Sequence, residues 1–246
     1  MTKRRCKINE SPKNVALHAV SLPGTGFDEH VARSVFGPAF AARGIDVTPI
    51  TPQPSHLIEG YFADLDELAK RTETLVLSGL SIGAVVAVQW ALRNPHRVAG
   101  VVAALPPWTD TPVGAPAAVS AAHTAQALRT EGLEAVVLAM RTSSPPWLAD
   151  LIERAWRTQW PDLPKAFEAV STYPHPTRAE LARLQVPVAL VGAIGDGVHP
   201  DTVCDDWAAV IPRSCVVKLP LTEVGTDTAS IGFAGLRALE RLGVVL

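Results

Sequence analysis

Short apolar runs alternate with amphipathic stretches along the first part of the chain. The runs have the length and the β-branched content of buried strands, and the stretches between them have helical spacing. Glycine and proline residues separate the two kinds of segment and mark the turns. The pattern therefore predicts a β-α-β-α-β-α-β series. The predicted strands lie at residues 15–22, 45–50, 74–78 and 98–105, and the predicted helices at residues 28–43, 57–71 and 82–93.

The alternation stops between residues 109 and 183, where the pattern is helical. Strands and helices alternate again beyond residue 183. Right-handed crossovers place helices on both faces of a parallel sheet. The pattern thus predicts an α/β fold with a doubly wound, mostly parallel sheet of about six strands and a helical lid inserted in it. The later predicted helices are 116–129, 133–140, 146–160, 163–170, 200–211 and 228–242, and the later strands are 186–191 and 215–219.

The chain length agrees with one such domain and its insertion. A chain of 246 residues with 48% hydrophobic content can bury one full core. We expect a core of residues 15–108 and 184–246, a helical lid of residues 109–183, and an N-terminal tail of residues 1–14.

The composition argues against several classes of partner. The net charge is -2 and the Lys and Arg residues are scattered, so no basic face for nucleic acid is expected. The apolar runs are far shorter than a bilayer span, and no apolar segment follows the basic residues near the N-terminus. We therefore expect a cytoplasmic protein with no membrane contact, whose partner is a small molecule.

Neither the cysteines nor the glycines predict a cofactor. Cys6, Cys204 and Cys215 form an odd set without the spacing of a zinc site, so reduced thiols and no metal are expected. Gly24 and Gly26 lack the third glycine of a dinucleotide-binding loop. No metal, nucleotide or flavin is therefore expected.

The candidate chemistry centres on the segment Gly79-Leu80-Ser81-Ile82-Gly83, which fits the G-x-S-x-G nucleophile elbow. It follows an apolar strand and opens a helix, as the motif requires. Glycines on either side let the strand and the helix approach closely and force the serine into a strained conformation with its hydroxyl projecting. Ser81 is the candidate nucleophile, and a serine that only caps the helix is the alternative.

From residue 15 onward the chain resembles the α/β-hydrolase superfamily. Four features occur in the order of that family: a glycine-rich loop at residues 23–26, the elbow at Ser81, a helical segment after the next strand, and Asp196 after the strand beyond it. The two strands with which the family usually begins are missing or very short, since 14 residues precede Val15. The resemblance implies the hydrolase fold and acyl transfer by Ser81.

The resemblance also implies the partners of the serine. The backbone N–H of Ile82, with that of Thr25 or Gly26, would form the oxyanion hole that stabilises developing negative charge. Asp196 takes the position of the acid that orients a histidine. Asp110, in the loop after an earlier strand, is the alternative acid.

The histidine of the family is absent from its usual place. The resemblance implies a base after the last strand, but residues 220–228 contain no histidine. His199 lies three residues beyond Asp196, where a local bond is easy. To reach Ser81 it must bridge a lateral gap of roughly 10 Å and come within about 3 Å. His199 is the candidate base, and its alternative role is to help start the next helix. The other candidate bases are His30, His123 and His175.

These residues predict a serine hydrolase acting on an ester, thioester or related carbonyl substrate with an apolar portion. Trp108 and Trp147, at the entry to the helical segment and within it, are the expected pocket residues, because such pockets are mostly aromatic and aliphatic. Two alternatives stay open, since a fold does not fix a function. One is a binding or scaffold protein that has lost the base, and the other is a lyase-like or cofactor-free enzyme using the same pocket.

Overall fold

Six parallel strands form the sheet. The computed structural model describes residues 17–246, so the expected tail, Cys6 and the first residues of the first strand lie outside the described residues. The strand order is β2-β1-β3-β4-β5-β6, and each neighbouring pair is parallel. The expected sheet is confirmed. Its strands are β1 (Leu17–Leu22), β2 (Val47–Pro49), β3 (Thr74–Leu80), β4 (Val98–Ala104), β5 (Val188–Ile194) and β6 (Ser214–Pro220).

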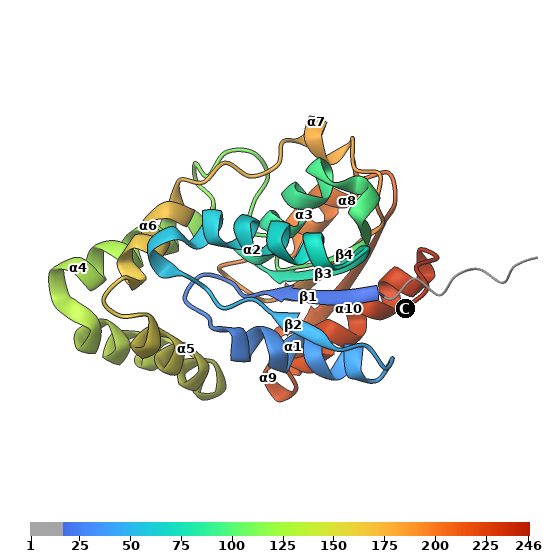
Figure 1. The fold of residues 1–246 in the computed structure, drawn as a ribbon. Coiled ribbons are helices and arrows are strands. Elements are labelled where there is room, and N and C mark those ends of the chain that lie inside the picture. The colour runs from blue at the N-terminus through green and yellow to red at the C-terminus, as the bar shows by residue number, and fades with distance from the viewer. Residues whose placement is uncertain (1–16) are drawn as a thin grey trace, which may run out of the picture.

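Helices cover both faces of the sheet (Figure 1). One face carries α1 (Glu29–Ala41) and α10 (Ala229–Arg241), and the other carries α2 (Leu57–Arg71), α3 (Ile82–Arg93) and α8 (Thr202–Ala208). Successive side chains of a strand point to opposite faces. In β4, Val101 and Ala103 therefore pack on the α3 side, and Val102 and Ala104 on the α10 side. All four are fully buried, which explains the unbroken apolar runs of the strands.

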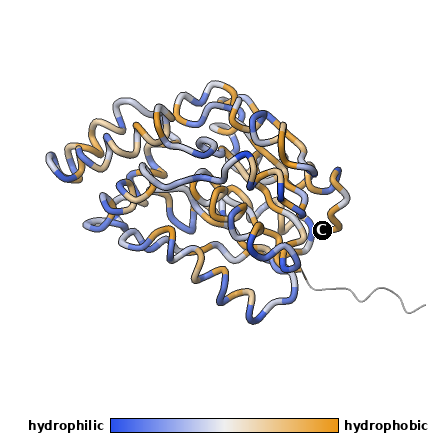
Figure 2. Tube along the Cα trace, turned by 90° about the horizontal axis from the view of Figure 1, so that it is seen from above, coloured by the Kyte–Doolittle hydropathy of each residue, from blue (hydrophilic) through white to orange (hydrophobic). Residues whose placement is uncertain are grey.

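The helical segment between β4 and β5 contains α4 (Pro116–Ser143), α5 (Pro146–Gln159), α6 (Leu163–Ser171) and α7 (Arg178–Leu181). Helices α4, α5 and α6 lie beyond the carboxyl ends of the strands, whereas α7 lies on the side of the sheet that carries α3 and α8 (Figure 1). The range of α4 holds two helices, as predicted at 116–129 and 133–140, because the backbone at Gly132 is not helical, with φ 81° and ψ 171°. Hydrophobic and hydrophilic stretches alternate along these helices (Figure 2), as expected when one face packs inward. The division into core and lid stays a prediction.

A short helix after β6 was not predicted from the sequence. Helix α9 (Leu221–Thr226) follows the strand directly and buries Val224. Six residues are too few to establish a helical period, which is why the pattern did not indicate it. None of the helices in residues 17–246 combines the length and the apolar character needed to cross a membrane.

The backbones of β3 and α3 approach each other closely. A Cβ atom on Gly79 would overlap the backbone of Gly83, and a Cβ atom on Gly83 would overlap the carbonyl oxygen of Leu22 in β1. A side chain at either position would therefore push α3 away from the sheet.

Replacing Gly83 by alanine tests this contact. We expect Gly83→Ala to lower the free energy of unfolding by about 1–3 kcal/mol, because backbone atoms that cannot rotate away surround the new methyl group. Gly37→Ala in α1 is the control, since its Cβ would come no closer than 3.4 Å to the Arg33 side chain and alanine favours a helix. Urea unfolding of both variants measures the difference, and equal stabilities would contradict the close contact.

Candidate active site

Ser81 sits in the strained turn that its motif predicted. It links β3 to α3 with φ 52° and ψ -117°, a conformation that costs a non-glycine residue about 1–3 kcal/mol. Its N–H donates to the carbonyl oxygen of Ala104 in the neighbouring strand, at 2.9 Å, which helps to hold the turn. The Ser81 side chain makes no capping bond to α3. The helix-cap alternative therefore does not describe its hydroxyl.

The Ser81 hydroxyl belongs to a hydrogen-bonded series of three side chains. His199 Nε2 lies 2.9 Å from Ser81 Oγ, and His199 Nδ1 lies 3.2 Å from Asp196 Oδ2. The side chains of His199 and Asp196 are 19% and 15% exposed, so the series is largely shielded from water. An ionised carboxylate only accepts hydrogen bonds, so Nδ1 carries a proton. In the neutral imidazole Nε2 is then an acceptor for the serine hydroxyl.

The carboxylate of Asp196 is held in its ionised form. Burial acts to raise its pKa, but the hydrogen bonds from the His199 ring and from the backbone N–H groups of His199 and Val198 outweigh it and lower the pKa below its ordinary value. A negative charge beside Nδ1 favours the orientation in which Nε2 faces Ser81.

One short loop after β5 supplies both Asp196 and His199. Asp196 Oδ1 accepts from the N–H groups of Val198 at 2.8 Å and His199 at 3.0 Å, so the side chain closes its own loop. Gly195, with φ 91°, turns the chain out of the strand. This folded loop carries the His199 imidazole past β4 to the elbow on β3. His199 therefore spans the lateral gap to Ser81 that the strand order imposes. Helix α8 begins only at Thr202.

The other candidate acid and bases do not join this series. The His30 side chain is 67% exposed on α1, beside Glu29. His123 lines the cavity without a bond to Ser81 among the described residues. His175 is buried and donates through Nδ1 to the Trp108 carbonyl oxygen at 3.2 Å, and burial lowers its pKa to about 3. In residues 17–246 no hydrogen bond joins the Asp110 carboxylate to an imidazole.

Three backbone N–H groups near Ser81 have no hydrogen-bond acceptor within residues 17–246. They belong to Ile82, Thr25 and Gly26, the residues predicted to form the oxyanion hole. The loop that carries Thr25 lies against the elbow, since a Cβ atom on Gly24 would come 3.4 Å from the Cβ of Ser81. These three donors are therefore without a partner among the described residues, and Ile82 and Thr25 line the cavity.

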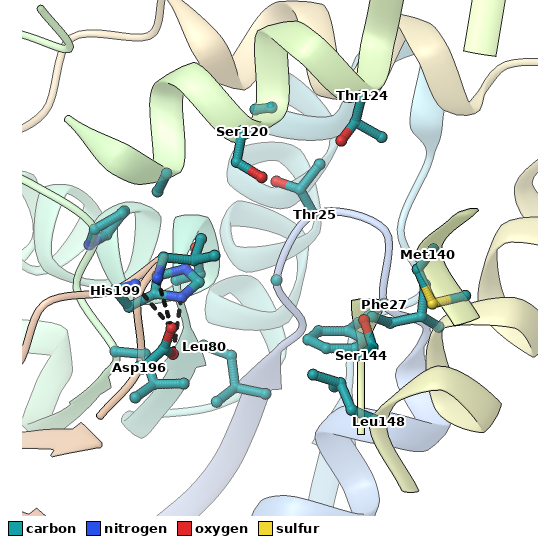
Figure 3. A pocket seen from close by; sticks show the side chains of 18 of the residues that line it. Thr25, Phe27, Leu80, Ser120, Thr124, Met140, Ser144, Leu148, Asp196 and His199 are labelled. Atoms are coloured by element: carbon teal, nitrogen blue, oxygen red, sulfur yellow. Dashed lines mark hydrogen bonds and ion pairs between the residues drawn. The ribbon is translucent and has the colours of Figure 1, made fainter. Parts of the chain in front are cut away.

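A cavity of about 610 Å³ opens beside Ser81, between the sheet and helices α4 to α6. Figure 3 shows Asp196 and His199 on one side of it and Met140, Phe27 and Leu148 on the other. Both expected pocket residues, Trp108 and Trp147, line the cavity. The lining residues that the sequence did not indicate include Phe27, Met140, Leu148, Trp156, Leu221 and Val224.

The lining of the cavity includes hydroxyl side chains and the carboxylate of Glu131, but no Lys or Arg side chain of the described residues. The side chain of Trp108 stacks on His175 with the ring centroids 3.7 Å apart, so this tryptophan forms a fixed wall. Among residues 17–246 no group of three or more His, Cys, Asp or Glu side chains is placed to hold a metal ion.

Comparison with known families agrees with this geometry. A model of the α/β-hydrolase family matches residues 8–225, which is most of the chain. The chain belongs to the α/β-hydrolase family. No curated protein matches this α/β hydrolase by sequence.

Solved structures similar to this α/β hydrolase share its fold. An esterase from Thermogutta terrifontis has a TM-score of 0.70 at 18% identity, over 94% of this chain and 92% of that one. An enol-lactonase from Burkholderia xenovorans LB400 has a TM-score of 0.65 at 19% identity, over 85% of each chain. A bromoperoxidase from Bacillus anthracis has a TM-score of 0.72 at 15% identity, over 91% and 92%. At such identities the likeness shows the fold alone.

The lowered pKa of Asp196 predicts an effect of pH on the stability of this α/β hydrolase. The unfolded chain takes up the proton at a higher pH than the folded one, so ionised Asp196 stabilises the fold above its ordinary pKa, and this contribution is lost as the pH falls below about 4. We expect Asp196→Asn to lose less stability than the wild type between about pH 5 and pH 3.

Urea midpoints across this pH range measure the effect. Asp206→Asn, at an exposed position on α8, controls for the removal of one negative charge. If the urea midpoints of the wild type and Asp196→Asn fall equally as the pH is lowered, the ionised Asp196 carboxylate does not stabilise the fold.

Proposed function

We propose that this chain is a serine hydrolase acting on an ester, thioester or related carbonyl compound with an apolar portion. One observation carries the proposal: the hydrogen bonds from Ser81 Oγ to His199 Nε2 at 2.9 Å and from His199 Nδ1 to Asp196 Oδ2 at 3.2 Å. A serine hydroxyl is a weak nucleophile until an adjacent base takes its proton. Two structures of the same fold are named an esterase and an enol-lactonase, which agrees with this substrate class.

In the proposed reaction Ser81 Oγ attacks the carbonyl carbon while His199 Nε2 accepts the hydroxyl proton. The π electrons of the carbonyl move to its oxygen, and the N–H of Ile82 with that of Thr25 or Gly26 stabilises the oxyanion. His199 then gives the proton to the departing alcohol or thiol, which leaves an acyl group on Ser81. Water, deprotonated by His199, hydrolyses this ester and restores the serine.

The same observation favours the hydrolase over the two alternatives. The binding-protein alternative supposed that the fold had lost its base, whereas an imidazole lies within 2.9 Å of the serine. A lyase-like enzyme would use the cavity without forming a covalent bond to Ser81. Reaction of the serine with a phosphonylating reagent separates the hydrolase from the binding-protein alternative, and hydrolysis of an ester separates it from the lyase-like one.

The cavity favours an uncharged acyl group. Its volume of about 610 Å³ is in the range of sites that enclose small organic ligands, and its walls are mainly aromatic and aliphatic. Since no Lys or Arg side chain of residues 17–246 lines it, a carboxylate or phosphate on the acyl chain would lose its hydration without gaining a cationic partner. We propose that the substrate is neutral at the end enclosed by the cavity.

A fluorophosphonate probe tests the nucleophile and its base. We expect the probe to label wild-type protein at Ser81, as mapped by mass spectrometry, and to leave Ser81→Ala unlabelled. His199→Ala should be labelled more slowly by roughly 10²- to 10⁴-fold, because the general base is lost.

His30→Ala is the matched control, since that imidazole is 67% exposed and does not line the cavity, and its labelling rate should equal the wild-type rate. If the folded wild-type protein does not react with the fluorophosphonate probe, the hydrolase proposal is wrong. Undiminished labelling of His199→Ala would assign the base to another group.

Matched esters test the preference for a neutral acyl group. We expect kcat/KM for 4-nitrophenyl hexanoate to exceed that for the 4-nitrophenyl monoester of adipic acid by about a hundredfold or more, because the terminal carboxylate would enter a cavity without cations. The 4-nitrophenyl methyl diester of adipic acid keeps the added atoms but removes the charge, so it should recover most of the rate. Equal values for the hexanoate and the monoester would contradict the proposal.

A further inference from the structure

Helix α5 contacts the loop near Ser81 that carries the N–H groups of Thr25 and Gly26, which have no acceptor among the described residues. This loop, residues 24–28, follows β1 and precedes α1. Its own bonds are few: Phe27 N–H donates to the Gly24 carbonyl oxygen at 3.1 Å, and Asp28 accepts from Val31 N–H at 3.0 Å as the cap of α1. Gly26, at the centre, has φ 73°. Further contacts come from α5, from Phe167 of α6, which lies against Gly26, and from Leu80 and Ser81, which lie against Gly24.

An ion pair joins α5 to the end of this loop. Arg154 Nη2 donates to Asp28 Oδ1 at 3.0 Å and Arg154 Nε donates to Asp28 Oδ2 at 3.2 Å, so the guanidinium engages both oxygens. The Asp28 side chain is 6% exposed, whereas that of Arg154 is 49% exposed. A two-point contact of this kind fixes direction as well as distance.

Two further residues of α5 hold the middle of the loop. Gln159 Nε2 donates to the Phe27 carbonyl oxygen at 2.9 Å. Trp156 covers Gly26 so closely that a Cβ atom there would lie 2.6 Å from the indole Nε1. Helix α5 thus contacts Gly26, Phe27 and Asp28, the residues that directly follow Thr25.

We propose that Arg154 is a positioning residue, which holds the N–H groups of Thr25 and Gly26 beside Ser81 through its ion pair with Asp28. The inference rests on the proposed function, because these N–H groups matter only if an oxyanion forms there. Arg154 does not line the cavity and lies outside the Ser81–His199–Asp196 series. Its effect therefore reaches the reaction only through the loop.

Arg157 provides a matched control on the same helix. Its guanidinium is 43% exposed and pairs with Glu134 at 2.7 Å and Glu153 at 2.9 Å, both in the helical segment. Arg157→Ala thus removes a comparable ion pair without touching the loop.

The experiment compares two ligands that differ in their need for an oxyanion hole. An alkyl trifluoromethyl ketone adds the serine hydroxyl to its carbonyl and forms a tetrahedral oxyanion, whereas the corresponding secondary alcohol cannot. We expect Arg154→Ala to weaken inhibition by the ketone roughly ten- to a hundredfold and to lower kcat for a neutral ester by a similar factor. The inhibition constant of the alcohol and KM should stay within about twofold.

Further variants separate positioning from a loss of structure. Arg154→Lys keeps the positive charge but cannot contact both Asp28 oxygens as the planar guanidinium does. Its kcat should therefore lie between those of Arg154→Ala and the wild type. Asp28→Asn removes the charge of Asp28 but keeps a residue that can cap α1. If Arg154 and Asp28 act through one ion pair, kcat of the double variant Asp28→Asn with Arg154→Ala should be no lower than that of the slower single variant.

Wild-type kcat in Arg154→Ala, or an equal loss for the ketone and the alcohol, would overturn the inference, as would an equal fall of kcat in Arg157→Ala. A wild-type protein that neither binds the ketone covalently nor reacts with the fluorophosphonate probe would instead refute the proposed function, so the two failures are distinguishable.

Discussion

The site depends on the backbone contact between β3 and α3. Gly79 and Gly83 leave no space for side chains where the strand meets the helix, so α3 begins directly against the sheet. Ser81 can then link the two elements only with a positive φ. The same contact presses Gly83 on Leu22 and brings Gly24 against Ser81. One packing constraint thus places the serine, the first N–H of α3 and the glycine-rich loop beside one another.

Much of the fold could be predicted because its central strands are buried on both faces. Such strands appear in the sequence as unbroken apolar runs, and those of β3, β4 and β5 are almost fully buried. The break at Gly132 was also predicted correctly, since the backbone is not helical there. The pattern missed helix α9, which is too short to show a period.

The site could be predicted only in its local parts. Ser81 follows from the motif around it, and Asp196 from its position shortly after a predicted strand. The reach of His199 could not be judged from spacing, because it depends on how Asp196 folds its own loop and on where β4 and β5 lie relative to the elbow. The pair of Arg154 and Asp28 joins residues 126 positions apart, and neither neighbourhood carries a signal of the other.

The position of His199 has a consequence for how this α/β-hydrolase-family protein can change over evolution. Asp196 and His199 lie on one short loop after β5, so their separation is set by five consecutive residues, 195–199. The segment after β6, where the resemblance implied a histidine, is instead helix α9, and its Leu221 and Val224 form cavity wall. The wall residues Leu221 and Val224 therefore lie on a different segment from Asp196 and His199. A substitution at Leu221 can change the shape of the cavity without changing the distance between the Asp196 carboxylate and the His199 ring.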